Sequence, residues 1–307
     1  GMVASWEAGE RPEIVFWAET MYPYSMLAPG AQGVVRRPRR YGDRDYEIPV
    51  DLEREIQERA LGEIARWIRT GGFFVTGSHL WEGVPADAGP GAYSVHTSEM
   101  VAFDREKRMV AHRPKSRLVP FGEFLPLASW LPDSREIARL IFRNVGLLPD
   151  LTERPPEGPL RLTLPGEDEL LLGSAVCWEN PFESIFRAQA LQGAEAFCVL
   201  SNEGWFGLGA EMDQMAAATR YRAAETGRAI LRVTNTGLTL WVDAHGEIRE
   251  ALPRGEPGWL AVFLPRTPRG YRSVYLLGGW LFLRALAALA GLLVLLSWLP
   301  GRLFRAP

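Results

Sequence analysis

The pattern of apolar and polar positions predicts strands that alternate with helices along most of the chain. Apolar runs without charge indicate buried strands, and apolar residues recurring at helical spacing between charges indicate an amphipathic helix at 51–70. The other predicted helices cover 182–191 and 212–226, and the predicted strands cover 13–18, 73–76, 93–95, 100–103, 170–176, 196–201, 229–234, 238–242 and 259–264. This alternation favours an α/β sandwich with mixed sheets.

A proline-rich stretch at 112–127 interrupts the alternation. It reads His-Arg-Pro-Lys-Ser-Arg-Leu-Val-Pro-Phe-Gly-Glu-Phe-Leu-Pro-Leu, and its prolines and glycine predict an ordered loop instead of a regular element. The loop carries Lys115 and Glu123. A lysine in a loop is most often a surface charge, but ordered loops are also where binding and catalytic groups concentrate.

The strand at 170–176 delivers Cys177 to its end. Pro181 stops the strand from continuing, and a helix follows from Phe182. A thiol at such a turn can be exposed in a cleft beside free N–H groups, which favour a thiolate or hold an oxyanion. A cysteine is more often a small buried hydrophobe than a nucleophile. Cys177 is therefore a candidate whose role depends on its partners.

Glu19 is a carboxylate directly after another predicted strand. Strand 13–18 precedes it, and an aromatic loop with Tyr22 and Tyr24 follows. A single glutamate is usually a solvated surface charge, an explanation that fits less well at the end of a buried strand. The second cysteine, Cys198, lies in the middle of strand 196–201 and is predicted to be structural.

Composition narrows the functional classes. The 307 residues suffice for one large domain or two small ones, and a hydrophobic share of 47% with 23% charged residues describes a folded protein. The formal net charge of −3 gives no electrostatic reason to expect a nucleic-acid partner. Two cysteines do not make a disulfide framework.

Two apolar segments stand out from this composition. At 274–299, Leu, Ala, Gly and Trp dominate and Arg284 is the one charged residue. This length is about that needed to cross a hydrocarbon core of roughly 30 Å, so we predict a transmembrane helix in preference to a buried or amphipathic one. The segment 125–148 either packs in the core or forms a lid that touches lipid, and the sequence favours neither.

Several motifs resemble the nitrilase (carbon–nitrogen hydrolase) superfamily and, within it, the catalytic domain of the apolipoprotein N-acyltransferase family. They fall in the family's order and cover nearly the whole chain. The string Leu-Val-Pro-Phe-Gly-Glu is far more specific than any single catalytic residue. The matching strings are Trp17-Ala18-Glu19, Leu118-Val119-Pro120-Phe121-Gly122-Glu123, Cys177-Trp178-Glu179, 200–207, 222–228 and Thr234-Asn235-Thr236-Gly237.

The resemblance implies a Glu19–Lys115–Cys177 catalytic triad. An ammonium beside a thiol favours the thiolate that attacks an ester carbonyl. Glu19 would accept the thiol proton and later deprotonate an incoming amine, while Lys115 and a backbone N–H would stabilise the oxyanion. The resemblance implies no cofactor and no metal. The further implied site residues are Glu123 and Glu179 as supporting groups, and Trp178 and Trp205 along the acyl and substrate cleft.

The fold implied is a nitrilase-like α-β-β-α sandwich at 1–270, followed at 271–307 by a transmembrane helix and a short tail. The implied activity moves a fatty acyl group from a phospholipid, through a cysteine thioester, to the N-terminal amine of a diacylglyceryl-cysteine lipoprotein. The partners are then the phospholipid donor, the lipoprotein acceptor and the membrane, with no nucleic acid. The implied location is the bacterial inner membrane, with the catalytic domain on the periplasmic side.

The chain also departs from the family pattern. Trp17-Ala18-Glu19 replaces the usual Trp-Pro-Glu, and Glu203-Gly204 replaces the more usual Asp-Ala. Little sequence precedes the first predicted strand. We therefore expect this chain to be the C-terminal part of such an enzyme or a shortened relative. The sandwich could then lack the first strand that the family has. Two other functions stay open: a hydrolase of small amides or nitriles, and an inactive, truncated, membrane-anchored domain.

Overall fold

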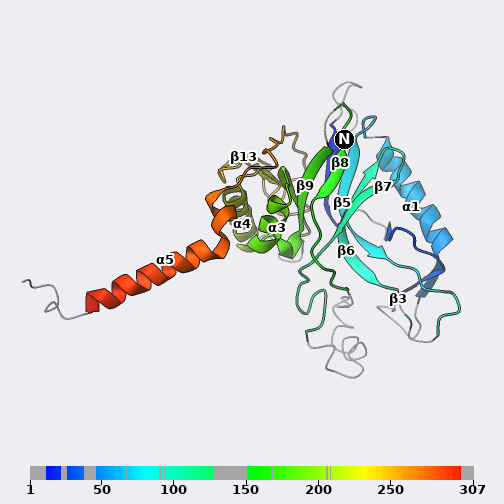
Figure 1. Ribbon diagram of the computed structural model, residues 1–307. Helices are drawn as coiled ribbons and strands as arrows, with labels where there is room; N and C mark the ends of the chain where they lie inside the picture. Colours follow the sequence, from blue (N-terminus) through cyan, green and yellow to red (C-terminus); the bar gives the residue numbers. More distant parts are fainter. Residues whose placement is uncertain are drawn as a thin grey trace, which may run out of the picture.

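Two β-sheets lie face to face with helices on their outer sides (Figure 1). The computed structural model describes residues 12–21, 26–37, 46–66, 68–89, 92, 94–126, 151–166, 169–204, 207 and 209–298. The segment 127–150, which holds nearly all of the apolar stretch predicted as core or lid, lies outside these residues. The predicted α/β fold with mixed sheets is confirmed, whereas the absence of a first strand stays a prediction.

The first sheet mixes parallel and antiparallel pairs in the order β1-β5-β6-β7. β1 runs parallel to β5, and the antiparallel strands β6 and β7 follow along the chain. A short strand, β2, also pairs with β5, and β3 and β4 form a separate antiparallel pair. The bounds are β1 (Ile14–Glu19), β2 (Met26–Leu27), β3 (Val34–Arg37), β4 (Tyr46–Pro49), β5 (Phe73–Trp81), β6 (His96–Asp104) and β7 (Met109–Pro114).

The second sheet has the order β13-β12-β11-β10-β9-β8, with a parallel centre formed by β9, β10 and β11. Parallel neighbours need crossover connections, which the helices α3 (Glu183–Leu191) and α4 (Glu211–Thr226) provide. The carboxyl ends of these three strands therefore lie along one edge. The bounds are β8 (Leu160–Thr163), β9 (Glu169–Val176), β10 (Ala196–Ser201), β11 (Ile230–Thr234), β12 (Leu240–Val242) and β13 (Ile248–Ala251).

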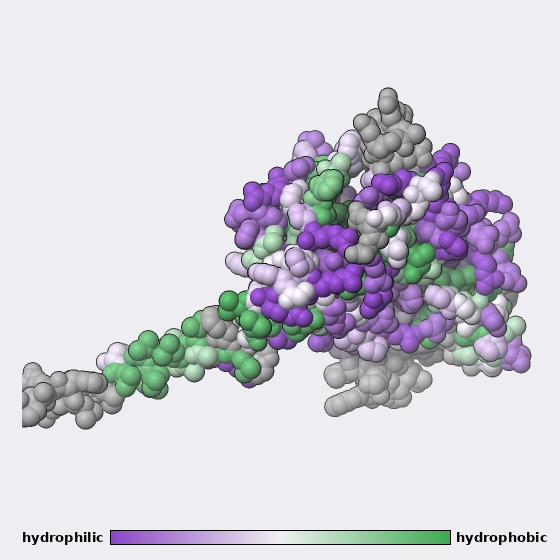
Figure 2. All heavy atoms as spheres, turned by 45° about the horizontal axis from the view of Figure 1, so that its top comes forward, coloured by the Kyte–Doolittle hydropathy of each residue, from purple (hydrophilic) through white to green (hydrophobic). Residues whose placement is uncertain are grey.

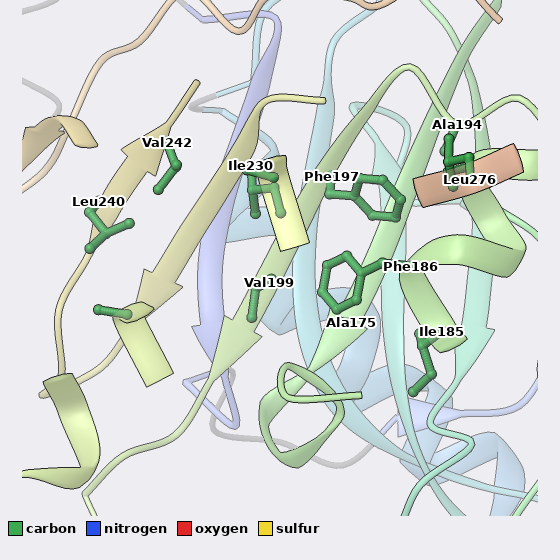
Figure 3. Packing of buried hydrophobic residues seen from close by; sticks show 13 residues of the cluster. Ala175, Ile185, Phe186, Ala194, Phe197, Val199, Ile230, Leu240, Val242 and Leu276 are labelled. Carbon is green, nitrogen blue, oxygen red and sulfur yellow. The ribbon is translucent and has the colours of Figure 1, made fainter. Parts of the chain in front are cut away.

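Three apolar clusters hold the four layers together. Side chains alternate across each strand, so Val75 of β5 faces the second sheet while Phe74 faces helix α1 (Val50–Ala65). Val75 and Phe74 thus belong to two different clusters, and a third cluster lies between the second sheet and helices α3 and α4 (Figure 3). There, the fully buried rings of Phe186 and Phe197 lie 5.0 Å apart between centroids. The order of layers is α-β-β-α, as the resemblance implies.

Helix α5 (Val274–Trp298) begins in this core and then extends away from it (Figures 1 and 2). Leu276 is 1% exposed, and its carbonyl accepts a hydrogen bond from Arg187 of α3 at 3.1 Å. Beyond the first turn, apolar side chains such as Leu295 and Trp298 are exposed. The boundary between domains at 270 stays a prediction, although the first turn of α5 packs with the sandwich.

The predicted C-terminal transmembrane helix is not found. Among the described helices, none combines the length and the apolar character that crossing a membrane requires. Gly279 has non-helical angles (φ 52°, ψ −147°) and divides α5. The apolar pattern of 274–299 therefore does not form one regular helix, and a hydropathy pattern carries no signal for such a break.

Three predicted elements are corrected in detail. The predicted helix at 51–70 ends at Ala65, and Ile68, which fits the helical period, is buried in the segment after the helix. β7 occupies the start of the proline-rich stretch, and Pro114 is tolerated as its last residue. The apolar run at 259–264 is not a strand, and Phe263 within it is 98% exposed. A short apolar run does not reveal whether a partner strand exists.

Candidate active site

The three triad candidates meet where strands of both sheets end. Glu19 is the last residue of β1, Cys177 follows β9 and Lys115 follows β7. The Lys115 Nζ atom lies 3.8 Å from Oε1 of Glu19. The Cys177 thiol lies near enough to Glu19 to lower the pKa of that carboxyl. Residues from three distant parts of the sequence thus form one contact cluster.

Glu19 is a buried carboxylate, 4% exposed. Its Oε2 accepts a hydrogen bond from the backbone N–H of Asn202 at 3.1 Å. The neighbouring strand leaves room for it, because a Cβ at Gly77 would lie only 2.9 Å from the Glu19 Cα. Burial raises the pKa of Glu19, an effect that the Lys115 charge opposes. A carboxyl with a raised pKa is suited to exchanging protons near neutral pH.

Lys115 is not a surface lysine, since it is 1% exposed. Its ammonium donates to Oε1 of Glu123 at 2.6 Å, and the other Glu123 oxygen accepts from the backbone N–H of Val119 at 2.7 Å. Burial alone would lower the pKa of Lys115, but the charges of Glu19 and Glu123 outweigh it and the pKa is raised. The site therefore holds a fixed positive charge at neutral pH.

Cys177 begins a single 3₁₀ turn, η3 (Cys177–Glu179), with a left-handed backbone (φ 50°). Such a conformation is uncommon for a residue with a Cβ and needs support from its surroundings. Burial raises the pKa of the Cys177 thiol to about 12, and Glu19 adds to this, whereas Lys115 and Ser201 act in the opposite direction. The resting thiol is therefore protonated at neutral pH, in contrast to the thiolate that the sequence suggested.

Glu179 joins the cysteine turn to the lysine loop. It is fully buried, and its Oε1 accepts from both the backbone N–H and the hydroxyl of Ser116, each at 2.8 Å. Its Oε2 accepts from the backbone N–H of Val176 at 2.9 Å and from Nη1 of Arg113 at 3.2 Å. Both carboxylate oxygens are thus used to hold Cys177 and Lys115 in register.

We expect Glu179→Gln to lower the free energy of unfolding by about 3–5 kcal/mol, because it leaves the buried Arg113 guanidinium without a charged partner. Denaturant unfolding measures this loss. Glu169→Gln is the matched control, since Glu169 pairs with the exposed Arg161 at 3.0 Å, and its cost should stay below about 1 kcal/mol. Equal costs for the two substitutions would contradict the role assigned to Glu179.

The two predicted cleft tryptophans have different outcomes. Trp178 is half-buried next to Cys177, and its ring meets that of Phe182 edge-on with 5.9 Å between centroids. The guanidinium of Arg117 lies 5.8 Å from the centre of the same Phe182 ring. Trp205 lies outside the described residues. A substrate-binding role for either tryptophan stays a prediction.

Sequence reasoning missed the groups that surround the cluster. Ser201, Asn202 and Glu203 belong to a string that matches the family, but no role was attached to them. The buried ion pair between Glu203 and Arg232 had no signal in the sequence, because Glu203 lies in the turn after β10 and Arg232 lies in β11, far along the chain. Within the described ranges, no group of three or more His, Cys, Asp or Glu side chains is placed to hold a metal ion.

Comparison with known proteins identifies the family. Residues 77–266 match the family described as carbon-nitrogen hydrolase. The chain belongs to this family. Its match covers most of the sandwich, from β5 through the last strand of the second sheet. The matched range includes Lys115 and Cys177, and Glu19 precedes it.

The relatives of this carbon–nitrogen hydrolase domain include longer proteins. It is 27% identical over 267 residues to the apolipoprotein N-acyltransferase of Rhizobium etli, covering 87% of this chain and 42% of the relative. It is 32% identical over 201 residues to that of Caulobacter vibrioides, covering 64% of this chain and 34% of the relative. The chain thus spans less than half the length of these relatives. A solved amidase from Nesterenkonia sp. is 20% identical, with 75% of this chain and 73% of that one covered and a TM-score of 0.48.

Proposed function

We propose that this domain transfers a fatty acyl group from a phospholipid to the N-terminal amine of a diacylglyceryl-cysteine lipoprotein through a thioester on Cys177. The observation that carries the proposal is the contact cluster of Glu19, Lys115 and Cys177. The relatives named apolipoprotein N-acyltransferase support the choice of acyl transfer within the carbon–nitrogen hydrolase family.

The first half of the proposed reaction forms the acyl-enzyme. Glu19 first accepts the thiol proton, and the resulting Cys177 thiolate then attacks the ester carbonyl, so the S–H bond breaks before the C–S bond forms. The tetrahedral oxyanion lies against the Lys115 ammonium, which is charged before the reaction starts. The C–O bond then breaks, and the proton on Glu19 passes to the departing lysophospholipid oxygen.

The second half transfers the acyl group to the amine. The neutral N-terminal amine attacks the thioester carbonyl, and Glu19 accepts a proton from the nitrogen. The C–N bond forms and the C–S bond breaks. The Cys177 sulfur takes the proton back from Glu19, and the enzyme returns to its starting state with an amide as product.

The raised pKa of the Cys177 thiol means that deprotonation must come before nucleophilic attack. A thiol with a pKa of about 12 is protonated at neutral pH. The sulfur therefore becomes a nucleophile only when Glu19, the carboxyl with which it interacts, takes its proton. The fixed charge of Lys115 stabilises both the thiolate and the later oxyanion, so one cation serves two successive anions.

The proposed substrates also fix where the reaction takes place. A phospholipid donor and a lipoprotein acceptor are both membrane components, so we place the reaction at the bacterial inner membrane with the catalytic domain on its periplasmic side. The exposed apolar side chains along α5 (Figure 2) are consistent with a lipid environment. Glu123 and Glu179 act as supporting groups, and Trp178 lies beside the acyl group.

The test combines the protein with a phospholipid carrying a labelled acyl chain and with a diacylglyceryl-cysteine peptide. We expect the label in an amide at the peptide N-terminus, detected by mass spectrometry, and only when both substrates are present. Hydrolysis of short amides without transfer would favour the amidase alternative that the family allows. No product from a protein whose Cys177 still reacts with an alkylating reagent would favour a catalytically silent domain.

A further inference from the structure

A buried polar chain leads from the Cys177 sulfur into the second sheet. Ser201, the last residue of β10, follows Leu200, which pairs with Val176 of the parallel strand β9, so Ser201 and Cys177 lie side by side at the ends of these two strands. The Ser201 hydroxyl oxygen lies 3.3 Å from Oε1 of Glu203, to which it donates a hydrogen bond. Glu203 in turn forms an ion pair with Arg232 of β11 through the same Oε1. Glu203 and Arg232 are fully buried, and Ser201 is 2% exposed.

The ion pair is enclosed by its surroundings. A Cβ at Gly237 would lie 1.6 Å from Oε2 of Glu203, so only glycine leaves room for this carboxylate. The backbone N–H of Glu203 donates to Asn235 at 2.9 Å and fixes the turn after β10. Apart from the ion pair, the guanidinium nitrogens of Arg232 have no hydrogen-bond partner among the described residues. Arg232 therefore acts on its surroundings through Glu203 and through its charge.

Ser201 has one proton and two neighbours that could accept it. A serine hydroxyl donates one hydrogen bond and accepts others. While the thiol is neutral, its proton is directed to Glu19, and Ser201 donates to Glu203. Once the thiol has lost its proton, the thiolate needs a donor, and the Ser201 hydroxyl can serve only by turning away from Glu203. How strongly Glu203 competes for this proton then affects the thiolate.

We propose that the Glu203–Arg232 ion pair positions the Ser201 hydroxyl. When the thiolate forms, the pair allows this hydroxyl to turn from Glu203 and to donate a hydrogen bond to the Cys177 sulfur. Arg232 occupies the same carboxylate oxygen that accepts from Ser201, so it weakens the competing hydrogen bond. The hydroxyl only rotates, and no covalent bond changes. The inference rests on the proposed role of Cys177 as the nucleophile.

Electrostatics around the sulfur agree with this arrangement. Burial lowers the pKa of Arg232 to about 10, and the nearby Cys177 acts in the opposite direction. Arg232 therefore stays charged at neutral pH, and because the interaction between two charges is mutual, it also favours the thiolate. The other charged groups that face the thiol are Glu19 from β1, and Lys115 and Glu123 from the loop after β7.

The proposal is tested by measuring, at a series of pH values, the rate at which iodoacetamide alkylates Cys177. Cys198→Ala is the background, so that one thiol remains. We expect Arg232→Met to slow alkylation near pH 8 about tenfold, the effect of one hydrogen bond to a charged group. The double variant Glu203→Gln/Arg232→Met should recover the parent rate within about threefold, because the competing carboxylate is then absent.

Ser201→Ala provides the second arm. We expect it to slow alkylation by itself, and Arg232→Met should then slow it less than in the parent, because no hydroxyl remains to be redirected and only the charge effect of Arg232 is lost. Arg228→Met is the matched control, since Arg228 is a fully buried arginine that donates to backbone carbonyls of Ala190 and Ala194 instead. Its alkylation profile should equal that of the parent, and circular dichroism checks the fold of every variant.

Any of three results overturns the proposal. The first is an alkylation profile of Arg232→Met equal to that of the parent, and the second is the same slowing by Arg232→Met in the Ser201→Ala background as in the parent. The third is an alkylation rate of Glu203→Gln/Arg232→Met as low as that of Arg232→Met. The last result would mean that Arg232 acts on the sulfur by its charge alone. If Arg232→Met does not fold, Glu203→Gln keeps the test decisive, because it removes the competitor and should speed alkylation, and a slower rate contradicts the proposal. Alkylation needs no acyl substrate, so a failure of acyl transfer would leave this measurement interpretable.

Discussion

Cys177→Ala is expected to abolish the acyl adduct that the protein forms with phospholipid, whereas Cys198→Ala is expected to keep it. Only the Cys177 thiol contacts a group able to take its proton, namely Glu19, and only it lies beside the Lys115 ammonium. Intact-mass measurement after incubation with phospholipid should show an added acyl mass that hydroxylamine removes, as it does from a thioester.

Cys198 is an informative control because it has the same thiol group as Cys177 but lies elsewhere in the fold. It is fully buried in the middle of β10, facing the cluster between the sheets, and burial raises its pKa well above the usual value. A buried thiol without a base is inert. An adduct that survives Cys177→Ala would move the acyl site elsewhere and would remove the basis of the proposed mechanism.

Much of the candidate site could be predicted because its residues stand at the ends of strands. Glu19 and Cys177 each follow an apolar run, and apolar runs are the strongest signal of buried strands. Parallel strands end at a common edge, so groups that follow them are brought together. The strand ends of the two sheets meet at the site, and this meeting was implied by the resemblance and not by periodicity.

The electrostatic state of the site could not be predicted in the same way. The sequence places a lysine near a cysteine, which by itself favours a thiolate. The structure buries the cluster, and burial outweighs Lys115 in setting the pKa of Cys177. The depth of a side chain depends on packing between distant segments, so neither composition nor spacing reports it.

The groups that support the triad were hidden for a related reason. Arg113 and Glu179 lie far apart in the sequence, yet they form a buried ion pair. Charged residues are usually exposed, so an arginine within a strand pattern is taken for a solvent-facing position. The sequence analysis did not predict strand β13, whose residues are all exposed, or the break at Gly279 in α5. Both depend on tertiary contacts.

Lys115→Arg is expected to lower the rate of peptide N-acylation at least about a hundredfold, the scale of losing one oxyanion donor. The Lys115 side chain is fully enclosed, with its nitrogen 2.6 Å from Glu123 and 3.8 Å from Glu19. A planar guanidinium is broader than an ammonium and prefers to grip a carboxylate with two nitrogens. In this space it would pair with Glu123 and withdraw from the position where the oxyanion forms.

The chain offers a matched control for this substitution because it contains two lysines. Lys107 is exposed in the turn between β6 and β7, so Lys107→Arg should leave the rate unchanged. Thermal unfolding of both variants separates a loss of chemistry from a loss of fold. Near-normal turnover in a folded Lys115→Arg variant would show that any positive charge at this position suffices. The geometry of a single compact cation between two carboxylates would then have no part in catalysis.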